Sequence, residues 1–246
     1  MAHQTLKQEK SLEKMLEESH VKLISYSKPA ADVKDGLHDC QDLIAFCARV
    51  SNPDNQMNTK TSQKLIKYLI KHGHWSPMEM TSACLEITTT RDIARQILRH
   101  RSFSFQEFSQ RYADPTKDLE FTTREARLQD PKNRQNSVET DNLELQATWE
   151  YKQLTVVEQA QKVYNWAIEN GIAKEQARSV LPEGLMMSRM YMNGTLRSWI
   201  HYIELRTDSS TQKEHREIAK MCAQQIAKVL PLVLEFSHLH EIVSGE

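Results

Sequence analysis

The stretch Gln96-Ile-Leu-Arg-His-Arg-Ser-Phe-Ser-Phe-Gln-Glu-Phe-Ser-Gln-Arg-Tyr112 organises the interpretation of the whole chain. Residues 91–98, which lead into it, predict a helix because Ile93 and Ile97 lie four apart on one face. The three cations of Arg-His-Arg then fall at the helix end, where positive charge suits the helix dipole. Guanidinium groups beside serine hydroxyls also match the oxygens of a phosphate. The three-residue string alone therefore leaves two interpretations open, an exposed helix end and an anion site.

Composition limits the classes of protein that need to be considered. A formal net charge of −1 provides no global basic field of the kind that nucleic-acid binders use. No apolar run approaches the roughly 20 residues that span a bilayer, and the polar N-terminus lacks the apolar core of a secretory signal. The four cysteines form no CxxC pair, and the Cys and His spacings match no standard zinc finger. We expect a cytoplasmic protein with reduced thiols, without a metal, a membrane or a nucleic-acid partner.

Apolar patterns predict an α+β fold that is organised as one catalytic domain. That domain spans residues 21–246, follows a charged extension over residues 1–20, and carries a polar, exposed insertion around residues 114–150. Strands are predicted over 21–26, 83–88 and 188–193, and helices over 40–50, 58–72, 91–98, 154–172, from Lys174, over 195–205, and through Ile218 to a stop at Pro231.

Finer features follow from turn and helix signals. In the 58–72 helix we expect Leu65, Tyr68 and Leu69 to face inward, and Gly73 to end the helix. Ser76-Pro77 predicts an extended turn, and Asn193-Gly194 predicts a turn after its strand. Thr195 is placed to cap the helix that follows.

The full spacing of the opening stretch is more specific than its first three residues. Arg-His-Arg is followed by seven residues, Ser109, one residue and Arg111. This pattern resembles the defining motif of the flavin-dependent thymidylate synthases, and Gln96, Glu107 and Tyr112 also fit that family. Four further blocks resemble the same family: 47–52, 74–79, Arg178 ahead of Val-Leu-Pro, and 195–206. Taken singly, His74, Glu79 and Arg178 have ordinary explanations as loop or helix-end residues.

The resemblance implies a reaction, a fold and an assembly. The uracil C5 of dUMP is methylated to give dTMP, methylenetetrahydrofolate supplies the carbon, and NADPH reduces a bound FAD that carries the hydride. The implied fold is a helical core with antiparallel strands packed on it, and the implied assembly is a homotetramer whose flavin sites lie between subunits. The family favours alanine and an aliphatic residue where this chain has Thr211 and His215, and we interpret both as packing variation.

The resemblance also assigns site residues. The implied dUMP-binding residues are Gln96, Arg99, Glu107, Ser109, Gln110, Arg111, Arg178 and Arg206. The implied FAD-binding residues are His74, Ser76, Glu79, Arg99, His100, Arg101, Glu107, Thr195, Leu196, Arg197 and His201. The catalytic candidates are Arg206, whose permanent charge would stabilise a pyrimidine deprotonated at N3, and Ser109.

Ser109 has no base near it in sequence to activate its hydroxyl, so we expect it to position the nucleotide rather than to attack it. The alternative from another class is a nucleotide or nucleic-acid phosphate-binding protein without redox chemistry. Such a protein would use the same arginines but would leave the blocks at 74–79 and 195–206 unexplained.

Overall fold

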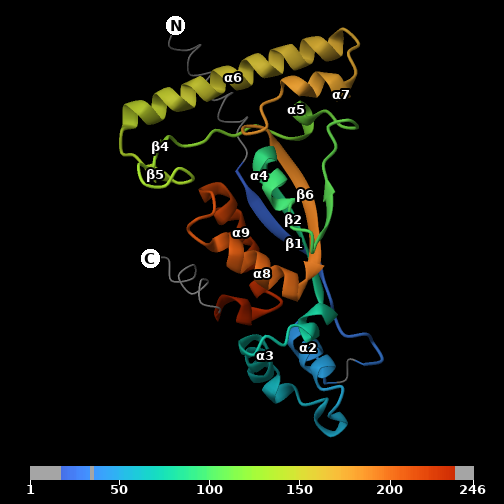
Figure 1. The fold of residues 1–246 in the computed structure, drawn as a ribbon. Coiled ribbons are helices and arrows are strands. Elements are labelled where there is room, and N and C mark those ends of the chain that lie inside the picture. The colour runs from blue at the N-terminus through green and yellow to red at the C-terminus, as the bar shows by residue number, and fades with distance from the viewer. Residues whose placement is uncertain (1–17, 34–35, 236–246) are drawn as a thin grey trace, which may run out of the picture. The chain divides into compact units, whose positions relative to one another are not determined.

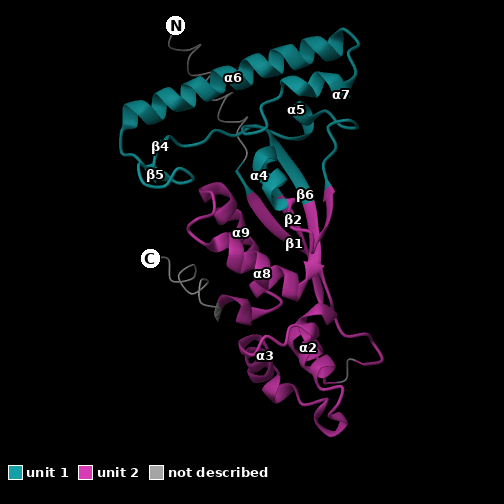
Figure 2. Cartoon of the chain, in the orientation of Figure 1, with its two compact units in different colours: residues 1–19, 88–97, 107–190 teal, residues 20–87, 98–106, 191–246 magenta. Residues whose placement is uncertain are grey.

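The computed structural model of this chain describes residues 18–33 and 36–235, so residues 1–17 of the predicted N-terminal extension lie outside the described part. The chain forms two compact units (Figure 2). Unit 1 takes residues 1–19, 88–97 and 107–190, and unit 2 takes residues 20–87, 98–106 and 191–246. Both units are assembled from separated segments, so no single cut of the chain divides them. One catalytic domain over residues 21–246 stays a prediction.

A four-stranded sheet has the order β1-β2-β6-β3 (Figure 1). Its strands are β1 (His20–Tyr26), β2 (Ser82–Thr90), β6 (Met187–Thr195) and β3 (Ser104–Glu107). In β2 the side chains of Ala83, Leu85 and Ile87 are buried, and residues between them are partly exposed, as alternation predicts. The strands predicted over 21–26, 83–88 and 188–193 are confirmed.

The turn predicted at Asn193-Gly194 is wrong, because β6 continues through both residues to Thr195. Gly194 is needed there for another reason. A Cβ atom on Gly194 would lie 2.4 Å from Cδ1 of Phe103, so the Phe103 ring occupies the space of a side chain.

In the described part of unit 2 there are four α-helices. They are α2 (Cys40–Ala48), α3 (Ser62–Lys71), α8 (Leu196–Thr207) and α9 (Lys213–Ala227). Short 3₁₀ helices complete the unit: η1 (Pro53–Asn55), η2 (Thr59–Thr61), η3 (Ser76–Met80) and η5 (Pro231–Glu235). α9 packs on α8 and β1, and α2 packs on α3 and η3. The buried face of α9 includes Ile218, Cys222 and Ile226, which confirms the predicted amphipathic helix.

Two predictions about α3 and its surroundings have different outcomes. The inward face of α3 is Ser62, Ile66 and Leu69, whereas Tyr68 is 54% exposed, so its predicted inward position is wrong. Gly73 ends the helix as predicted, with φ +71° in the left-handed region.

Unit 1 contains α4 (Arg91–Ile97), α5 (Pro115–Asp118), α6 (Leu143–Glu169), α7 (Lys174–Ala177) and η4 (Arg178–Val180). Its buried core joins Phe121 to Val157, Tyr164 and Ala167 of α6 and to Met186. Figure 1 shows α7 beside the C-terminal part of the long α6.

The polar insertion at 114–150 is more ordered than the sequence suggests. Asp114 caps α5, Leu119 and Phe121 are buried, and β4 (Arg127–Gln129) pairs antiparallel with β5 (Ser137–Glu139). α6 begins at Leu143 rather than at Leu154, because the Asn142 side chain accepts a hydrogen bond from Leu145 N and caps the helix. The insertion is exposed mainly at the β4–β5 hairpin and the first two turns of α6.

The α+β class is confirmed, with helices beside antiparallel strands. No helix in the described residues is long and apolar enough to cross a membrane.

Candidate active site

The structure divides the predicted site residues between its two units. Unit 2 holds those predicted for FAD with the exception of Glu107: His74, Ser76, Glu79, Arg99, His100, Arg101, Thr195, Leu196, Arg197 and His201. It also holds Arg206. Unit 1 holds the remaining dUMP candidates: Gln96, Glu107, Ser109, Gln110, Arg111 and Arg178.

α8 and η3 bring several of the unit 2 candidates together. Thr195 caps α8, as predicted, by accepting a hydrogen bond from Ser198 N at 3.2 Å. In the first turn of α8, Arg197 forms an ion pair with Glu79 of η3. The extended turn predicted at Ser76-Pro77 is wrong, because these two residues begin the 3₁₀ helix η3. Proline fits the first turn of a helix. This short helix presents Glu79 to Arg197.

His201 lies one turn after Arg197 and contacts the ring of Trp75, with the ring centroids 4.3 Å apart and the ring planes tilted by 54°. Burial lowers the pKa of His201, and Arg197 lowers it further, against an opposing effect of Glu204. The histidine is therefore neutral at physiological pH. Leu196 lies beside this pair, but its side chain is fully buried and its N–H donates to Thr81 O at 3.0 Å.

His74 is positioned by the end of α3. Its N–H donates to Leu69 O at 2.8 Å, and the N–H of Gly73 donates to Ile70 O at 3.1 Å. This pair of hydrogen bonds is a Schellman motif, which needs a left-handed residue at Gly73. The backbone of His74 is thus fixed while its side chain stays exposed.

Arg206, near the end of α8, is fixed by the middle residue of the Arg-His-Arg string. Its Nε donates a hydrogen bond to Nε2 of His100 at 2.9 Å. Burial and, to a smaller extent, the charges of Arg206 and Arg99 lower the pKa of His100 to about 4. His100 is therefore a neutral acceptor at physiological pH.

The flanking arginines of the string behave differently from His100. Arg99 and Arg101 are exposed, and within the described part of the chain neither forms an ion pair. Two uncompensated guanidinium groups on one short segment suit an anionic ligand such as a diphosphate. The donor set of unit 2 therefore fits the phosphates of FAD.

Glu107 of unit 1 is held among cations. Its carboxylate lies 3.4 Å from Arg91 Nη1 and 3.2 Å from Arg95 Nη1, and it accepts a hydrogen bond from Ser188 Oγ at 2.8 Å. Arg91 is buried, and burial lowers its pKa while Glu107 and Glu183 raise it. Glu107 thus neutralises a buried guanidinium.

The second half of the motif is anchored by α7. Lys174 Nζ donates to Tyr112 O at 2.9 Å, and Arg111 lies 3.4 Å from Glu175. Two residues before Arg111, Ser109 Oγ accepts a long hydrogen bond of 3.4 Å from Arg111 N.

Gln110 is the polar residue of this segment whose surroundings point to a ligand. Its side chain is buried, and its Nε2 has no hydrogen-bond partner among the described residues. A buried amide donor without a partner is costly, so a ligand acceptor there would stabilise it. Gln96 on α4 and Arg178 in η4 are both partly exposed.

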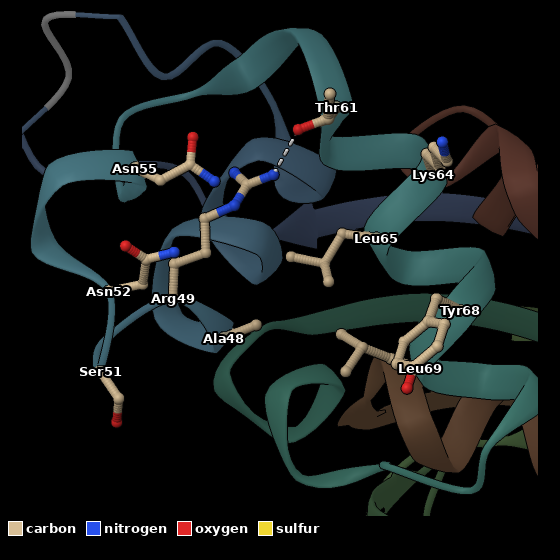
Figure 3. A pocket seen from close by; sticks show the side chains of 10 residues that line it. All are labelled: Ala48, Arg49, Ser51, Asn52, Asn55, Thr61, Lys64, Leu65, Tyr68 and Leu69. Carbon is tan, nitrogen blue, oxygen red and sulfur yellow. Dashed lines mark hydrogen bonds between the residues drawn. The ribbon is translucent and has the colours of Figure 1, made fainter.

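Unit 2 also has a cavity of about 480 Å³ that is lined by none of the residues predicted to bind dUMP or FAD. It lies between α2 and α3 (Figure 3) and is lined by Ala48, Arg49, Ser51, Asn52, Asn55, Thr61, Lys64, Leu65, Tyr68 and Leu69. The guanidinium of Arg49 donates to Asn58 O at 2.6 Å and to Thr61 Oγ1 at 2.8 Å. Arg49, Ser51 and Asn52 belong to the 47–52 block, so that block builds this wall.

A comparison with protein families gives a match over most of the chain. The family described as thymidylate synthase complementing protein matches residues 32–232. The chain belongs to this family. The predicted membership of the flavin-dependent thymidylate synthases is thereby confirmed.

Individual relatives agree with the family. A probable flavin-dependent thymidylate synthase of Paramecium bursaria Chlorella virus 1 is 49% identical over 212 residues, which are 86% of this chain and 95% of that protein. The flavin-dependent thymidylate synthase of Synechocystis sp. is 48% identical over 213 residues, 87% of this chain and 96% of the relative. The UMP/dUMP methylase PolB of Streptomyces cacaoi, solved with 5-Br dUMP, has a similar fold, with a TM-score of 0.72, 24% identity, and coverage of 93% of this chain and 95% of PolB.

Several residues that contact the predicted site residues were not predicted from the sequence. Trp75 lies within the 74–79 block, but no local sequence pattern predicts its contact with the ring of His201. Tyr202 and His215 lie behind His100, and their hydroxyl and imidazole are 3.2 Å apart. The unusual histidine at 215 was the available signal, and reading it as simple packing missed its contact with Tyr202.

The described residues contain no group of three His, Cys, Asp or Glu side chains that could hold a metal ion. The four cysteines are free thiols, two of them buried.

Proposed function

We propose that this chain is a flavin-dependent thymidylate synthase that methylates dUMP to dTMP. Its family membership supports the reaction. The observation that carries the assignment of residues is the fixed guanidinium of Arg206, which lies in the same unit as the exposed Arg99 and Arg101. The reaction needs one cation fixed against a base and others available to phosphates, and this arrangement supplies both.

Arg206 is the residue that we assign to the pyrimidine. Making C5 of the uracil nucleophilic requires electron density in the ring, and that density is greatest when N3 has lost its proton. A guanidinium that stays charged at every physiological pH stabilises the anionic ring. Arg206 would do so with the N–H groups that His100 does not use.

The nucleotide phosphate and sugar are assigned to unit 1. Arg111 and Arg178 supply charge, Gln110 supplies a buried amide donor, and Ser109 supplies a hydroxyl that orients the nucleotide. Gln96 and Glu107 complete this set. The ion pairs of Glu107 with Arg91 and Arg95 fix its carboxylate for that purpose.

FAD is assigned to unit 2, where Arg99 and Arg101 would hold its phosphates and His74, Ser76, Glu79, Arg197 and His201 its remaining polar groups. Thr195 and Leu196 begin the helix that carries two of these residues. When bound, FAD carries the hydride that NADPH supplies. The protein residues bind and orient, and the methylene carbon comes from methylenetetrahydrofolate.

A homotetramer with flavin sites between subunits is part of the proposal. Trp149, Val156 and Val163 recur seven residues apart along α6 and are 45%, 51% and 36% exposed. Apolar side chains at that spacing form a stripe along one side of a helix. An exposed stripe on a 27-residue helix supports association of α6 with another subunit. Free thiols agree with a cytoplasmic location.

The absorption spectrum of the purified protein tests the proposal, measured before and after addition of FAD and removal of the excess. We expect bound-flavin bands that NADPH bleaches, and dTMP formation from dUMP and methylenetetrahydrofolate. Absence of bound flavin under both conditions would exclude the synthase and favour a phosphate-binding protein without redox chemistry.

A further inference from the structure

The hydrogen bond between Arg206 and His100 constrains both side chains. Arg206 donates through Nε, so Nε2 of His100 must carry a lone pair, and the imidazole is neutral with its proton on Nδ1. A guanidinium has five N–H donors, and this bond uses one. The four on its terminal nitrogens make no hydrogen bond within the described residues.

The ring of His100 is braced by aromatic residues of unit 2. It meets Tyr202 edge to face, with centroids 4.9 Å apart at 81°, and meets Phe103 at 6.5 Å and 84°. Tyr202 is 1% exposed, and its hydroxyl lies 3.2 Å from Nε2 of His215, which is fully buried. The rings of His100 and His215 are 6.5 Å apart. Segment 98–103, α8 and α9 therefore enclose the imidazole together.

We propose that His100 is a positioning residue for the reaction: its neutral imidazole, braced by Tyr202 and His215, fixes the Arg206 guanidinium so that the terminal N–H groups face the pyrimidine. This inference rests on the proposed function, which places Arg206 at the base. It gives the middle residue of the Arg-His-Arg string a role through Arg206 in place of the flavin contact expected from the sequence.

The charges around His100 agree with a neutral acceptor. The groups that face it are Arg206 and Tyr202 from α8, Arg99 from its own segment and His215 from α9. A proton on His100 would remove the acceptor and place a cation beside two arginines. Burial and these arginines lower the pKa of His100 to about 4, and burial, Arg206 and His100 lower that of His215 to about 3.

Two substitutions separate positioning from simple packing. His100→Gln places an amide oxygen close to the position of Nε2, so an acceptor remains but nothing titrates. His100→Leu fills similar space without an acceptor. If the imidazole merely packs, leucine is the better replacement, whereas if it positions Arg206, glutamine is.

The experiment compares the wild type, His100→Gln and His100→Leu as FAD-loaded proteins. We expect all three to bind flavin equally, His100→Leu to lose at least about tenfold in kcat/KM for dUMP, and His100→Gln to stay within about threefold of the wild type. Crystal structures should show Arg206 displaced in His100→Leu and retained in His100→Gln. Equal kcat/KM for His100→Leu and the wild type would overturn the inference, and so would loss of flavin in His100→Leu, which would indicate a direct flavin contact.

A double-mutant cycle of His100→Leu with Arg206→Lys tests the contact itself. Lysine has no Nε–H to donate in this geometry, so Arg206→Lys removes the same contact from the other side. We expect this cycle to be strongly non-additive, and additive effects would overturn the inference. The same cycle with His100→Gln, which keeps the acceptor, is the control and should be close to additive. Failure of the proposed function is a different result, because the wild type itself would then bind no flavin, while the crystallographic position of Arg206 would still report on the contact.

Discussion

In the role that we propose for it, Arg206 must keep its charge and must also hold its guanidinium in a fixed direction. The charge comes from the delocalised guanidinium itself. The direction comes from one hydrogen bond at Nε, made by a residue more than a hundred positions earlier in the chain. Ser109 contrasts with it, because among the described residues its hydroxyl makes one long hydrogen bond, to a backbone N–H, and pairs with no base. The two catalytic candidates should therefore respond differently to substitution.

Arg206→Ala should nearly abolish dTMP formation, by about a thousandfold or more in kcat, because it removes the charge that we propose acts on the reacting ring. Ser109→Ala should lower turnover by only about tenfold, since it removes one positioning hydrogen bond. Steady-state rates at saturating FAD measure both. Arg134→Ala is a matched control, because Arg134 is an exposed guanidinium on the β4–β5 hairpin. A Ser109→Ala protein that binds dUMP but is completely inactive would contradict the positioning role.

His215 should make the free energy of unfolding depend on pH. Its folded pKa is about 3, whereas an unfolded histidine titrates near ~6.5, so below that pH the unfolded chain binds a proton that the folded chain refuses. Stability that is present above ~6.5 is therefore lost as the pH falls, by about 1.4 kcal/mol per pH unit from this residue.

His215→Gln tests this dependence, because the amide can still bond Tyr202 but cannot titrate. Urea unfolding at about pH 7 and about pH 5.5 should lose about 1 kcal/mol more in the wild type than in the variant. Equal losses in both proteins would mean that His215 is protonated in the folded state.

At the scale of elements, the sequence predicted most helices and strands but not their finer geometry. Alternation in β2 and the 3.6-residue period in α9 are local patterns, and the structure follows them. Tyr68 was misplaced because Ile66 and Tyr68 give α3 two possible apolar faces, and packing against α2 decides between them. The first turns of α6 were missed because they have no apolar inward face: Gln153 is buried, whereas Leu143 and Tyr151 are 81% and 66% exposed, and the start of the helix is fixed by an Asn142 cap.

The residues of the candidate site could be predicted where they belong to a motif with fixed spacing. They could not be predicted where a contact joins residues that are distant in the sequence. The blocks at 74–79, 96–112 and 195–206 were recognisable as sequence. The bond from Arg206 to His100 and the ion pair of Glu107 with Arg91 join residues that no local pattern connects. Only the fold can reveal such pairs.

Gly194 offers a test of an element that the sequence misread. Gly194→Ala should destabilise the protein by about 1–3 kcal/mol, because the new methyl group meets the Phe103 ring inside a packed aromatic cluster. Gly184→Ala is the control: a Cβ there meets no atom within 4 Å, and the substitution should be neutral or slightly stabilising. Thermal melting measures both, and equal stability of the two variants would contradict the close-approach explanation.

At the scale of the whole molecule, the near-zero net charge and the local clusters of arginine fit together. A net charge of −1 attracts no polyanion from a distance, so phosphate binding must depend on a few fixed cations. Arg99, Arg101 and Arg206 belong to unit 2, and Arg111 and Arg178 to unit 1. In the proposed homotetramer, arginines from different subunits would complete one phosphate-binding site on assembly. Flavin binding would then depend on the oligomeric state.

The apolar stripe on α6 provides the test of that assembly. Val156→Glu introduces a charge at the middle of the stripe, where Val156 is 51% exposed, and should dissociate the proposed homotetramer because burying an unpaired carboxylate is costly. Asn165→Glu adds the same charge at an exposed position on the opposite side of α6 and should leave the assembly intact. Light scattering gives the mass of each protein, and flavin absorbance gives the bound cofactor. We expect Val156→Glu to lose FAD together with the tetramer, because the proposed assembly places the flavin sites between subunits. A monomeric wild type that holds FAD, or a dissociated Val156→Glu that keeps it, would show that one chain suffices to bind the flavin.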